Sequence, residues 1–520
     1  MPVQFTIYDA PVGLTSIALT VFASIGGFVF GYDTGQIACI TPLPDFLQRF
    51  GQTDASGKKY LSNARNGLIV GLLSIGTLTG AVTGGYISDI IGRRKAMTCA
   101  ASMIVVGIII QMTSTHVWQQ FAMGRFVAGL GVGALSANVP TYQAELAPKQ
   151  IRGSLVGTYQ LAITLGILVA ECFGIGLRRL DSAASWRTLI GLCIVFCFIL
   201  GVGILFMPES PRWLLMHGKP EEARKSLARV RGTTVDALDP YVEHDFHEIQ
   251  KSCEIELTYG KGTWSECFSS RMRMRTLLGI LLQMFQQLTG ANFFFYYGAT
   301  LFAGVGLSDG YATQIILGAV NVVCTFPGLY FYERFGRRKP LIFGGIWQSF
   351  WLFAYSIAGT AGNPLTSKPI GNFMIVASCL FIAGFASCWG PGVWLVTSEM
   401  YPTRTRAKMQ SLSVSSNWLW NFLLAFFTPF ITDSISYRYG FVFACCNFVG
   451  MAIVFFFIKE GAGLSLEQLE VLWEDKDTPA WRSASWSPPG YANRRDAMEV
   501  NSNEKKGLAT QSEPEHHEDV

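Results

Sequence analysis

The sequence predicts an all-α membrane protein with twelve transmembrane helices arranged in two six-helix halves. Half of the 520 residues are hydrophobic and only 15% are charged, whereas soluble domains hold about 25% charged residues. Most charges lie in short clusters between long apolar runs, and such runs are long enough to cross a bilayer as helices. Paired motifs about 250 residues apart indicate the two halves.

With about 20 apolar residues for each span, the first half is expected to cross at 14–40, 66–88, 97–113, 119–144, 154–177 and 188–207. The second half is expected to cross at 276–304, 312–332, 340–359, 372–396, 408–430 and 440–459. This division leaves an N-terminal segment 1–13, a helical linker 208–275 between the halves 14–207 and 276–459, and a tail 460–520. The tail has a largely disordered composition, most clearly from about Lys476.

Basic residues gather in the loops that follow spans two, four, eight and ten. They are Arg93, Arg94, Lys95, Lys149, Arg152, Arg334, Arg337, Arg338, Lys339, Arg404, Arg406 and Lys408. These loops share one side with the linker, and the positive-inside rule makes that side cytoplasmic, with both termini inside. Five residues of the opposite loops run against the rule: Lys58, Lys59, Arg178, Arg179 and Arg187.

Two motifs occur once in each half. GYISDIIGRRK, 85–95, follows span two, and YERFGRRK, 332–339, follows span eight. A Glu-x2-Pro-x3-Arg pattern ends span four at Glu145, Pro148 and Arg152, and it ends span ten at Glu399, Pro402 and Arg406. Parallel repeats of this kind predict a rocking transporter with its site at the interface of the halves.

The stretch QQLTGANFFFYY, 286–297, places several amides inside an apolar run. An unpaired amide in hydrocarbon costs several kcal/mol, so these side chains need a purpose. On a regular helix Asn292 would lie roughly 240° round from Gln286, and the two can share a cavity only if the helix breaks, for which Gly290 is suited. The stretch therefore indicates a site for a polar, uncharged solute, with amides that join helices as the alternative.

Asp33 and Arg125 are ionisable residues inside predicted spans, which marks them as functional candidates. Counted along their helices, both lie roughly 10 Å below the outer surface, so they could form an ion pair. The pair could respond to protons, or it could hold spans one and four together permanently. Glu171 follows Gln160 on nearly the same face; we expect it near the outer surface beside Arg178 or Arg179, and a place above the site is the alternative.

Other function classes find no support in the sequence. The twelve cysteines lack metal-ligand spacing, and no phosphate-binding Gly-x4-Gly-Lys-Ser/Thr motif or catalytic constellation occurs. The net charge of +4 gives no indication of nucleic-acid binding. We therefore expect a monomer in a lipid bilayer that is not an enzyme and uses no metal or cofactor, except a proton as coupling ion.

The motifs together resemble the sugar porters of the major facilitator superfamily, and within them the fungal hexose transporters. Besides the stretches quoted above, the resemblance rests on FGYDTG (30–35), GRFVAGLGVG (124–133), ELAPKQIRG (145–153), PESPRW (208–213) and SSNWLWNF (415–422). One motif departs from the family: span twelve often closes with Pro-Glu-Thr-Lys-Gly, whereas 459–463 here reads KEGAG. This departure puts a cytoplasmic contact in doubt.

The resemblance implies a sugar site whose amides donate and accept hydrogen bonds while staying neutral. Its residues would be Gln160, Gln286, Gln287, Asn292, Asn321, Trp394 and Asn421, with Phe30, Phe385 and Trp418 as weaker candidates for packing against the sugar ring. Tyr296 and Tyr297 resemble the outer gate over bound sugar. In the sugar–proton symporters of this family an aspartate like Asp33 takes up the proton and releases the arginine, here Arg125.

The resemblance also implies a cytoplasmic gate made of salt bridges between the halves. The expected pairs are Asp89 with Arg93 and Arg94, Glu145 with Arg152, Glu209 with Arg212, Glu333 with Arg337 and Arg338, and Glu399 with Arg406. Exposed pairs are worth only about 0–1 kcal/mol each, which suits a gate that must open. The alternative is that these charges serve topology alone.

The expected function is monosaccharide transport across the plasma membrane by alternating access, with glucose as the first candidate substrate. Proton-coupled symport is the first hypothesis, and facilitated diffusion through the same site is the second. A sugar sensor is the third, although the tail is short for the partner binding that such sensors need.

Overall fold

The structure is a computed structural model that describes residues 4–7, 10–55, 57–147, 152–232, 240–259, 263–302, 310–364, 366–402, 404–462, 464 and 466–489. Among the residues singled out above, Pro148 and Lys149 lie outside the described residues, as do the side chains of Arg152 and Glu333.

The N-terminal half is built from helices that follow the predicted spans. They are α1 (Leu14–Ala23) with α2 (Ile25–Ile40), α4 (Asn63–Ile91), α5 (Arg93–Thr113), α6 (Trp118–Leu146), α7 (Arg152–Leu177) and α8 (Ala184–Gly203). A hairpin of β1 (Gln4–Ile7) and β2 (Ala10–Gly13) precedes them, and α3 (Pro44–Phe50), β3 (Gln52–Thr53) and β4 (Lys59–Tyr60) lie between α2 and α4. Helices suit apolar runs because they satisfy every backbone hydrogen bond internally.

The C-terminal half repeats this plan. Its helices are α12 (Arg273–Gln287) with α13 (Ala291–Leu301), α14 (Gly310–Phe335), α15 (Arg338–Ala361), α16 (Lys368–Gly384) with η3 (Phe385–Trp389) and α17 (Gly390–Met400), α18 (Arg406–Ile435), η4 (Ser436–Arg438) and α19 (Tyr439–Phe457). The first half ends with η1 (Ile204–Phe206), and the linker holds α9 (Pro211–Met216), α10 (Pro220–Arg231), α11 (Pro240–Tyr259) and η2 (Glu266–Phe268).

Ten helical segments of the described chain are long and apolar enough to cross a membrane. One of them, Lys408–Phe457, joins α18 to α19 and holds two spans, and the broken helix α12–α13 supplies one more. The predicted twelve spans in two halves are therefore confirmed.

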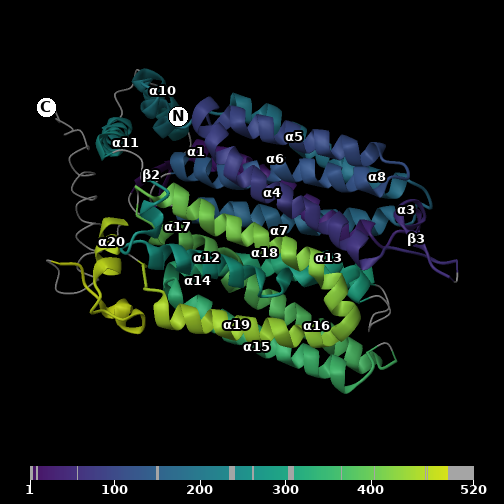
Figure 1. The fold of residues 1–520 in the computed structure, drawn as a ribbon. Coiled ribbons are helices and arrows are strands. Elements are labelled where there is room, and N and C mark those ends of the chain that lie inside the picture. The colour runs from purple at the N-terminus through teal and green to yellow at the C-terminus, as the bar shows by residue number, and fades with distance from the viewer. Residues whose placement is uncertain are drawn as a thin grey trace, which may run out of the picture.

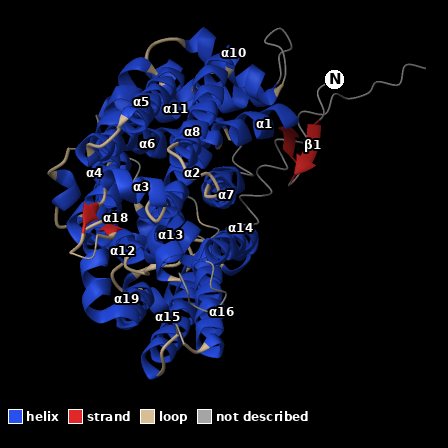
Figure 2. Cartoon of the chain, turned by 90° about the vertical axis from the view of Figure 1, so that its right-hand side faces the viewer, coloured by secondary structure: helices blue, strands red, loops and turns tan. Residues whose placement is uncertain are grey.

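The two halves lie side by side along their long axes (Figure 1). The linker helices α10 and α11, helix α20 (Leu466–Glu474) and strand β2 lie at one end of the bundle, called here the linker end, whereas α3 and β3 lie at the opposite, far end. Figure 2 views the bundle from the far end. The halves meet where α4 packs on α18, α7 on α14 and α2 on α13.

Three of the spans are interrupted. The predicted break at Gly290 is present, with φ of 92°, a backbone conformation that glycine adopts without strain. Two interruptions were not predicted: Ser24 separates α1 from α2, and η3 is a π-helical turn. The π-turn lies next to Pro391, which has no N–H to continue the regular hydrogen-bond pattern.

The expectation that the tail is largely disordered is wrong for its described part. Leu466–Glu474 forms α20, and Ala480–Ser485 forms the 3-10 turn η5. Leu469 and Leu472 are buried, and the Ser483 hydroxyl, also buried, accepts a hydrogen bond from the Glu460 N–H at 2.8 Å. A few apolar side chains within a polar composition were enough to dock this segment on the C-terminal half. The part of the prediction that concerns 490–520 lies outside the described residues.

Candidate functional site

The break in the seventh span brings amides of two helix segments together. Helix α12 ends at Gln287 and α13 begins at Ala291, and the Asn292 Nδ2 donates to Gln287 Oε1 at 2.5 Å. A Cβ added at Gly290 would lie 2.7 Å from the Phe443 ring, so both the backbone angle and the space require glycine there. The predicted meeting of these amides across the break is therefore present.

The amides continue across to α18 as one network. Gln287 Nε2 donates to Gln286 Oε1 at 3.1 Å and to Asn417 Oδ1 at 2.9 Å. Asn417 Nδ2 in turn donates to Gln283 Oε1 at 2.8 Å and to Gln286 Oε1 at 2.9 Å. Asn421 Nδ2 donates to Gln287 Oε1 at 3.2 Å. These side chains, together with Asn292, are called here the amide network.

The network reaches the other half through Asn421. Its Oδ1 accepts hydrogen bonds from the Ser74 hydroxyl of α4 at 2.5 Å and from the Tyr296 hydroxyl at 3.0 Å. Tyr297 also bonds to α18, donating to the Ala425 carbonyl at 2.5 Å. Both predicted gate tyrosines are buried against α18.

Sequence reasoning missed three members of this arrangement: Gln283, Asn417 and Ser74. The first two could have been found from spacing, because Gln283 lies one turn before Gln286 and Asn417 lies one turn before Asn421. Ser74 carried no such signal, since a serine in an apolar helix usually bonds to its own backbone.

Other predicted site residues make no hydrogen bond to the network among the described residues. Gln160 is half-buried beside Gly390 of α17, and Trp394 is half-buried on the same helix. Asn321 is buried, and its Oδ1 has no partner in the described part of the chain. The Phe30 and Trp418 rings lie 5.3 Å apart, and the Trp418 Nε1 also lacks a described partner. Phe385 is buried in η3.

The predicted ion pair between spans one and four is present. Arg125 Nη1 lies 3.1 Å from Asp33 Oδ1 and 3.2 Å from Oδ2, and the exposed fractions of the two side chains are 1% and 0%. Gln36 Nε2 donates a further hydrogen bond to Asp33 Oδ1 at 2.6 Å. Arg125 Nε and Nη2 have no partner within the described ranges, so part of this buried cation is unsatisfied, which is costly.

The expected pairing of Glu171 with Arg178 or Arg179 is not present among the described residues. Its side chain is only 1% exposed, and its carboxylate accepts a hydrogen bond from Gln314 Nε2 of α14 at 3.0 Å. Arg178, its expected neighbour, lies over the Tyr311 ring instead, 4.9 Å from the centroid. The reason is the packing of α7 on α14, which turns the face of Glu171 toward the other half.

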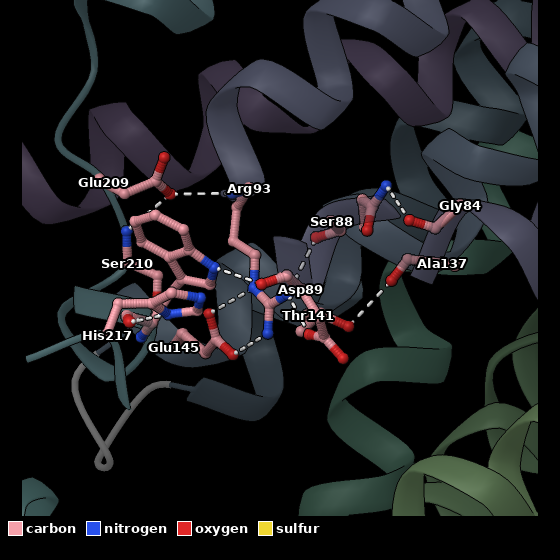
Figure 3. Close-up of polar contacts among 12 residues, drawn as sticks. Gly84, Ser88, Asp89, Arg93, Ala137, Thr141, Glu145, Glu209, Ser210 and His217 are labelled. Carbon is pink, nitrogen blue, oxygen red and sulfur yellow. Dashed lines mark hydrogen bonds and ion pairs between the residues drawn. The ribbon is translucent and has the colours of Figure 1, made fainter. Parts of the chain in front are cut away.

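A charge cluster lies at the linker end of the N-terminal half, around Arg93 (Figure 3). Its guanidinium bonds to Asp89 at 2.6 Å and to Glu145 at 3.2 Å. Glu209 accepts hydrogen bonds from the backbone N–H of Arg93 at 3.0 Å and of Arg94 at 3.4 Å. A carboxylate that caps the first N–H groups of a helix is favourable, and Glu209 does this for α5.

The C-terminal half repeats the cluster. Arg337 binds Glu399 with two contacts, 2.7 Å from Nη2 and 2.9 Å from Nε. Glu460 accepts from the backbone N–H of Arg337 at 2.9 Å and of Arg338 at 3.0 Å. Glu460 belongs to the KEGAG run, so this run caps a helix even though it departs from the family pattern.

The pairings expected from the resemblance need correction. Glu145 contacts Arg93, and the side chain of its expected partner Arg152 lies outside the described residues. Glu399 contacts Arg337, whereas Arg406 donates to the Tyr401 carbonyl at 3.0 Å. Glu209 caps backbone groups instead of engaging Arg212 as expected. The pairs of Arg93 and Arg337 lie inside one half each, because each arginine faces the helix that ends beside it in its own repeat.

The twelve spans form a bundle of two repeated halves, and a polar network is buried where these halves meet. This arrangement defines a secondary transporter of the major facilitator fold. The family described as "Sugar (and other) transporter" matches residues 19–473. The chain therefore belongs to the sugar transporter family, whose members are transporters and not enzymes.

Named relatives and solved structures agree with this assignment. A high-affinity glucose transporter of Schizosaccharomyces pombe is 41% identical over 477 residues, covering 91% of this chain and 89% of the relative. A high-affinity fructose transporter of the same yeast is 40% identical over 501 residues, covering 95% and 92%. The proton:xylose symporter XylE bound to 6-bromo-6-deoxy-D-glucose is similar with a TM-score of 0.73 and 25% identity, covering 88% of this chain and 99% of that one.

Proposed function

We propose that this protein carries hexoses, glucose first among them, across the plasma membrane by alternating access. The single observation that carries the proposal is the amide network, which joins α12, α13 and α18 and reaches α4 of the other half through Ser74 and Asn421. The names of the relatives, glucose and fructose transporters, support the substrate class.

The chemistry of the network suits a sugar. Each amide offers donors and acceptors that match hydroxyl groups, and none carries a charge that would have to be neutralised. The amides now bond to one another, so a sugar would exchange these bonds for its own. Since each such bond contributes roughly 0.5–1.5 kcal/mol net, several are needed for a useful affinity. Asn321 Oδ1 and Trp418 Nε1, which have no partner among the described residues, are further groups that a hydroxyl could satisfy.

Contacts between the halves gather toward the far end. There Asn63 donates to Asp433 at 3.3 Å and Tyr311 donates to the Cys39 carbonyl at 3.0 Å, while a Cβ at Gly67 would lie 2.5 Å from the Phe426 carbonyl. We infer a conformation that is closed at the far end. With the basic loops on the cytoplasmic side, the far end is extracellular, both termini are inside, and the conformation faces inward.

Coupling to protons is proposed at Asp33. A carboxylate paired with a partly unsatisfied cation can exchange that pairing for a proton, and the cation is then released. The similar protein XylE is a proton:xylose symporter, and this likeness favours symport over uniport. The proton is then the coupling ion, and the sugar and the lipid bilayer are the other partners of the protein. A monomer contains the complete proposed site.

Radiolabelled glucose uptake tests the proposal in cells that lack their own hexose carriers. Symport predicts accumulation above the equilibrium level and its collapse with a protonophore. Uptake that only equilibrates would contradict symport and leave a uniporter. No uptake from a chain that reaches the plasma membrane would contradict transport and favour a sugar sensor.

A further inference from the structure

The Glu171 carboxyl group lies between the halves, apart from the amide network and from the Asp33–Arg125 pair. It belongs to α7 of the N-terminal half and accepts its hydrogen bond from Gln314 of α14 in the C-terminal half, at 3.0 Å. The bond therefore holds the two halves together on the far-end side of the bundle. Because its donor is a neutral amide, this bond brings no positive charge to the carboxyl group.

The hydrogen bonds of this pair are incomplete. Gln314 Nε2 uses its two hydrogens, one toward Glu171 and one toward the Phe295 carbonyl at 3.2 Å. The remaining oxygens, Glu171 Oε2 and Gln314 Oε1, are buried and have no hydrogen-bond partner among the residues described. A pair made of an ionised carboxylate and an amide thus has one donor too few.

The packing around both oxygens is close. A Cβ added at Gly318 would lie 2.1 Å from Glu171 Oε2, and one added at Gly298 would lie 2.1 Å from Gln314 Oε1. Glycines at these two positions leave room for the oxygens and little else. An ionised carboxylate in such a place loses its hydration, and a buried carboxyl group takes up a proton rather than remain charged there.

The other titratable groups near Glu171 come from three helices. Helix α2 presents Cys39, which is buried; α7 itself carries Cys172, which is exposed, and Arg178; α14 presents Tyr311. Arg178 lies over the Tyr311 ring, and the Tyr311 hydroxyl donates to the Cys39 carbonyl. The cation and the phenol are thus engaged with each other at the far end.

We propose that Glu171 is a protonation site that controls closure of the far end: the acid form holds α7 against α14, and the ionised form lets them separate. A neutral acid has one O–H donor, so protonation supplies the donor that the pair lacks, and Gln314 Oε1 is an acceptor without a partner among the described residues. The proton comes from water at the far end while it is open and returns there when it reopens. This inference rests on the proposed alternating-access function.

The sign of the pH dependence follows from the proposal. The far-end-closed state binds one more proton than the open state, so it is favoured at low pH and lost as pH rises. One proton changes the ratio of closed to open molecules by up to about tenfold for each pH unit.

Spin labels at the far end test the inference on the purified full chain. Gln119→Cys on α6 and Thr366→Cys before α16 are exposed positions of opposite halves, and the exposed native thiols Cys99, Cys172 and Cys445 are replaced by serine. Double electron–electron resonance then measures the distance between labels from about pH 5 to about pH 8. We expect a short-distance population at low pH that gives way to a longer one. Glu171→Gln, which keeps the shape and stays neutral, should hold the short distance at every pH.

Two further variants test whether the pH-dependent distance comes from the Glu171–Gln314 pair or from Asp33. Gln314→Leu removes the partner and should reduce the short-distance population at every pH, whereas Asp33→Asn should keep the pH-dependent shift. An unchanged distance in the parent chain, or a Glu171→Gln variant that titrates like the parent, would overturn the inference. The distances need no sugar, so a chain that fails in glucose uptake yet shows this shift would count against the proposed function alone.

Discussion

At the residue scale, Asn417 is the member of the amide network that connects α18 to three glutamines of α12. It joins Gln283 and Gln286 through its Nδ2 and Gln287 through its Oδ1. Removing its side chain takes one hydrogen bond from each of these glutamines and leaves the buried Gln283 Oε1 without a partner among the described residues. An unsatisfied buried group costs about 1–3 kcal/mol. The orientation of the α12 glutamines therefore depends in part on Asn417.

Asn417→Ala should lower the apparent affinity for glucose by about tenfold or more, since 1.4 kcal/mol corresponds to a factor of ten. Gln348→Ala is the matched control, because Gln348 is another buried glutamine whose one hydrogen bond within the described part of the chain goes to the Gly344 carbonyl of its own helix. The measurement is the concentration dependence of glucose uptake at equal surface expression. An Asn417→Ala variant that behaves like Gln348→Ala would contradict the role assigned to the network.

The ion pair makes a second prediction at this scale. Asp33→Asn keeps the size of the side chain but leaves Arg125 without a negative partner and removes the proton acceptor. We expect this variant to lose accumulation of glucose against a gradient while sugar exchange down a gradient persists. The comparison is uptake with and without a protonophore, and accumulation that survives in Asp33→Asn would contradict coupling at this residue.

At the scale of single elements, the broken helix α12–α13 depends on the conformation of Gly290. Its φ of 92° and the nearby Phe443 ring both oppose a side chain. Gly57 offers a matched comparison, because its φ is 79° but nothing lies within 4 Å of an added Cβ. Both substitutions by alanine meet the same backbone strain, and only the one at Gly290 also meets a steric clash.

Gly290→Ala should therefore lower the melting temperature of the purified protein more than Gly57→Ala does, and it should reduce glucose uptake. Backbone strain of this kind costs roughly 1–2 kcal/mol, and forced overlap in a packed core adds typically about 1–3 kcal/mol. Thermal unfolding in detergent measures both variants. Equal melting temperatures would show that the break tolerates a side chain.

The docked tail gives another prediction for an element. Ser483 is buried and accepts from the Glu460 N–H, whereas Ser485 is exposed and donates to the Arg482 carbonyl of its own turn. Ser483→Ala should cost about 1 kcal/mol of stability, and Ser485→Ala should stay within about 0.5 kcal/mol. Melting temperatures of the two variants make the comparison, and an equal loss in both would contradict docking through Ser483.

Much of the element plan could be predicted from the sequence, because span length and hydropathy are local properties. The break at Gly290 was also predictable, since one glycine lay between amides that had to meet. The π-turn at Phe385–Trp389 and the docked tail were not predictable in this way. Both depend on contacts with distant residues, and the composition of 476–489 favoured disorder.

At the scale of the whole molecule, the two halves repeat one cluster: Arg93 with Glu145 and Glu209, and Arg337 with Glu399 and Glu460. The residues of these clusters were largely predictable from the repeated motifs, but their partners were not. A motif fixes which charges lie at a helix end, while the direction of each side chain depends on how the helices pack. The partner of Glu171 was missed for the same reason.

The repeat predicts similar roles for Glu209 and Glu460. Each accepts hydrogen bonds from two successive backbone N–H groups at the start of a helix. Glu209→Ala and Glu460→Ala should each destabilise the protein by a similar amount, about 1–3 kcal/mol, because charged acceptors are lost from partly buried N–H groups. Chemical or thermal unfolding of the two variants tests this, and a large effect in only one half would contradict an equivalent role.

The central claim is that the amide network between the halves binds a hexose. The most direct test is equilibrium binding of radiolabelled glucose to the purified protein, comparing the parent chain with Gln287→Ala, Asn292→Ala and the control Gln348→Ala. We expect a loss of affinity of about tenfold or more for the first two variants and none of this size for the control. Unchanged glucose affinity in both network variants would contradict the claim.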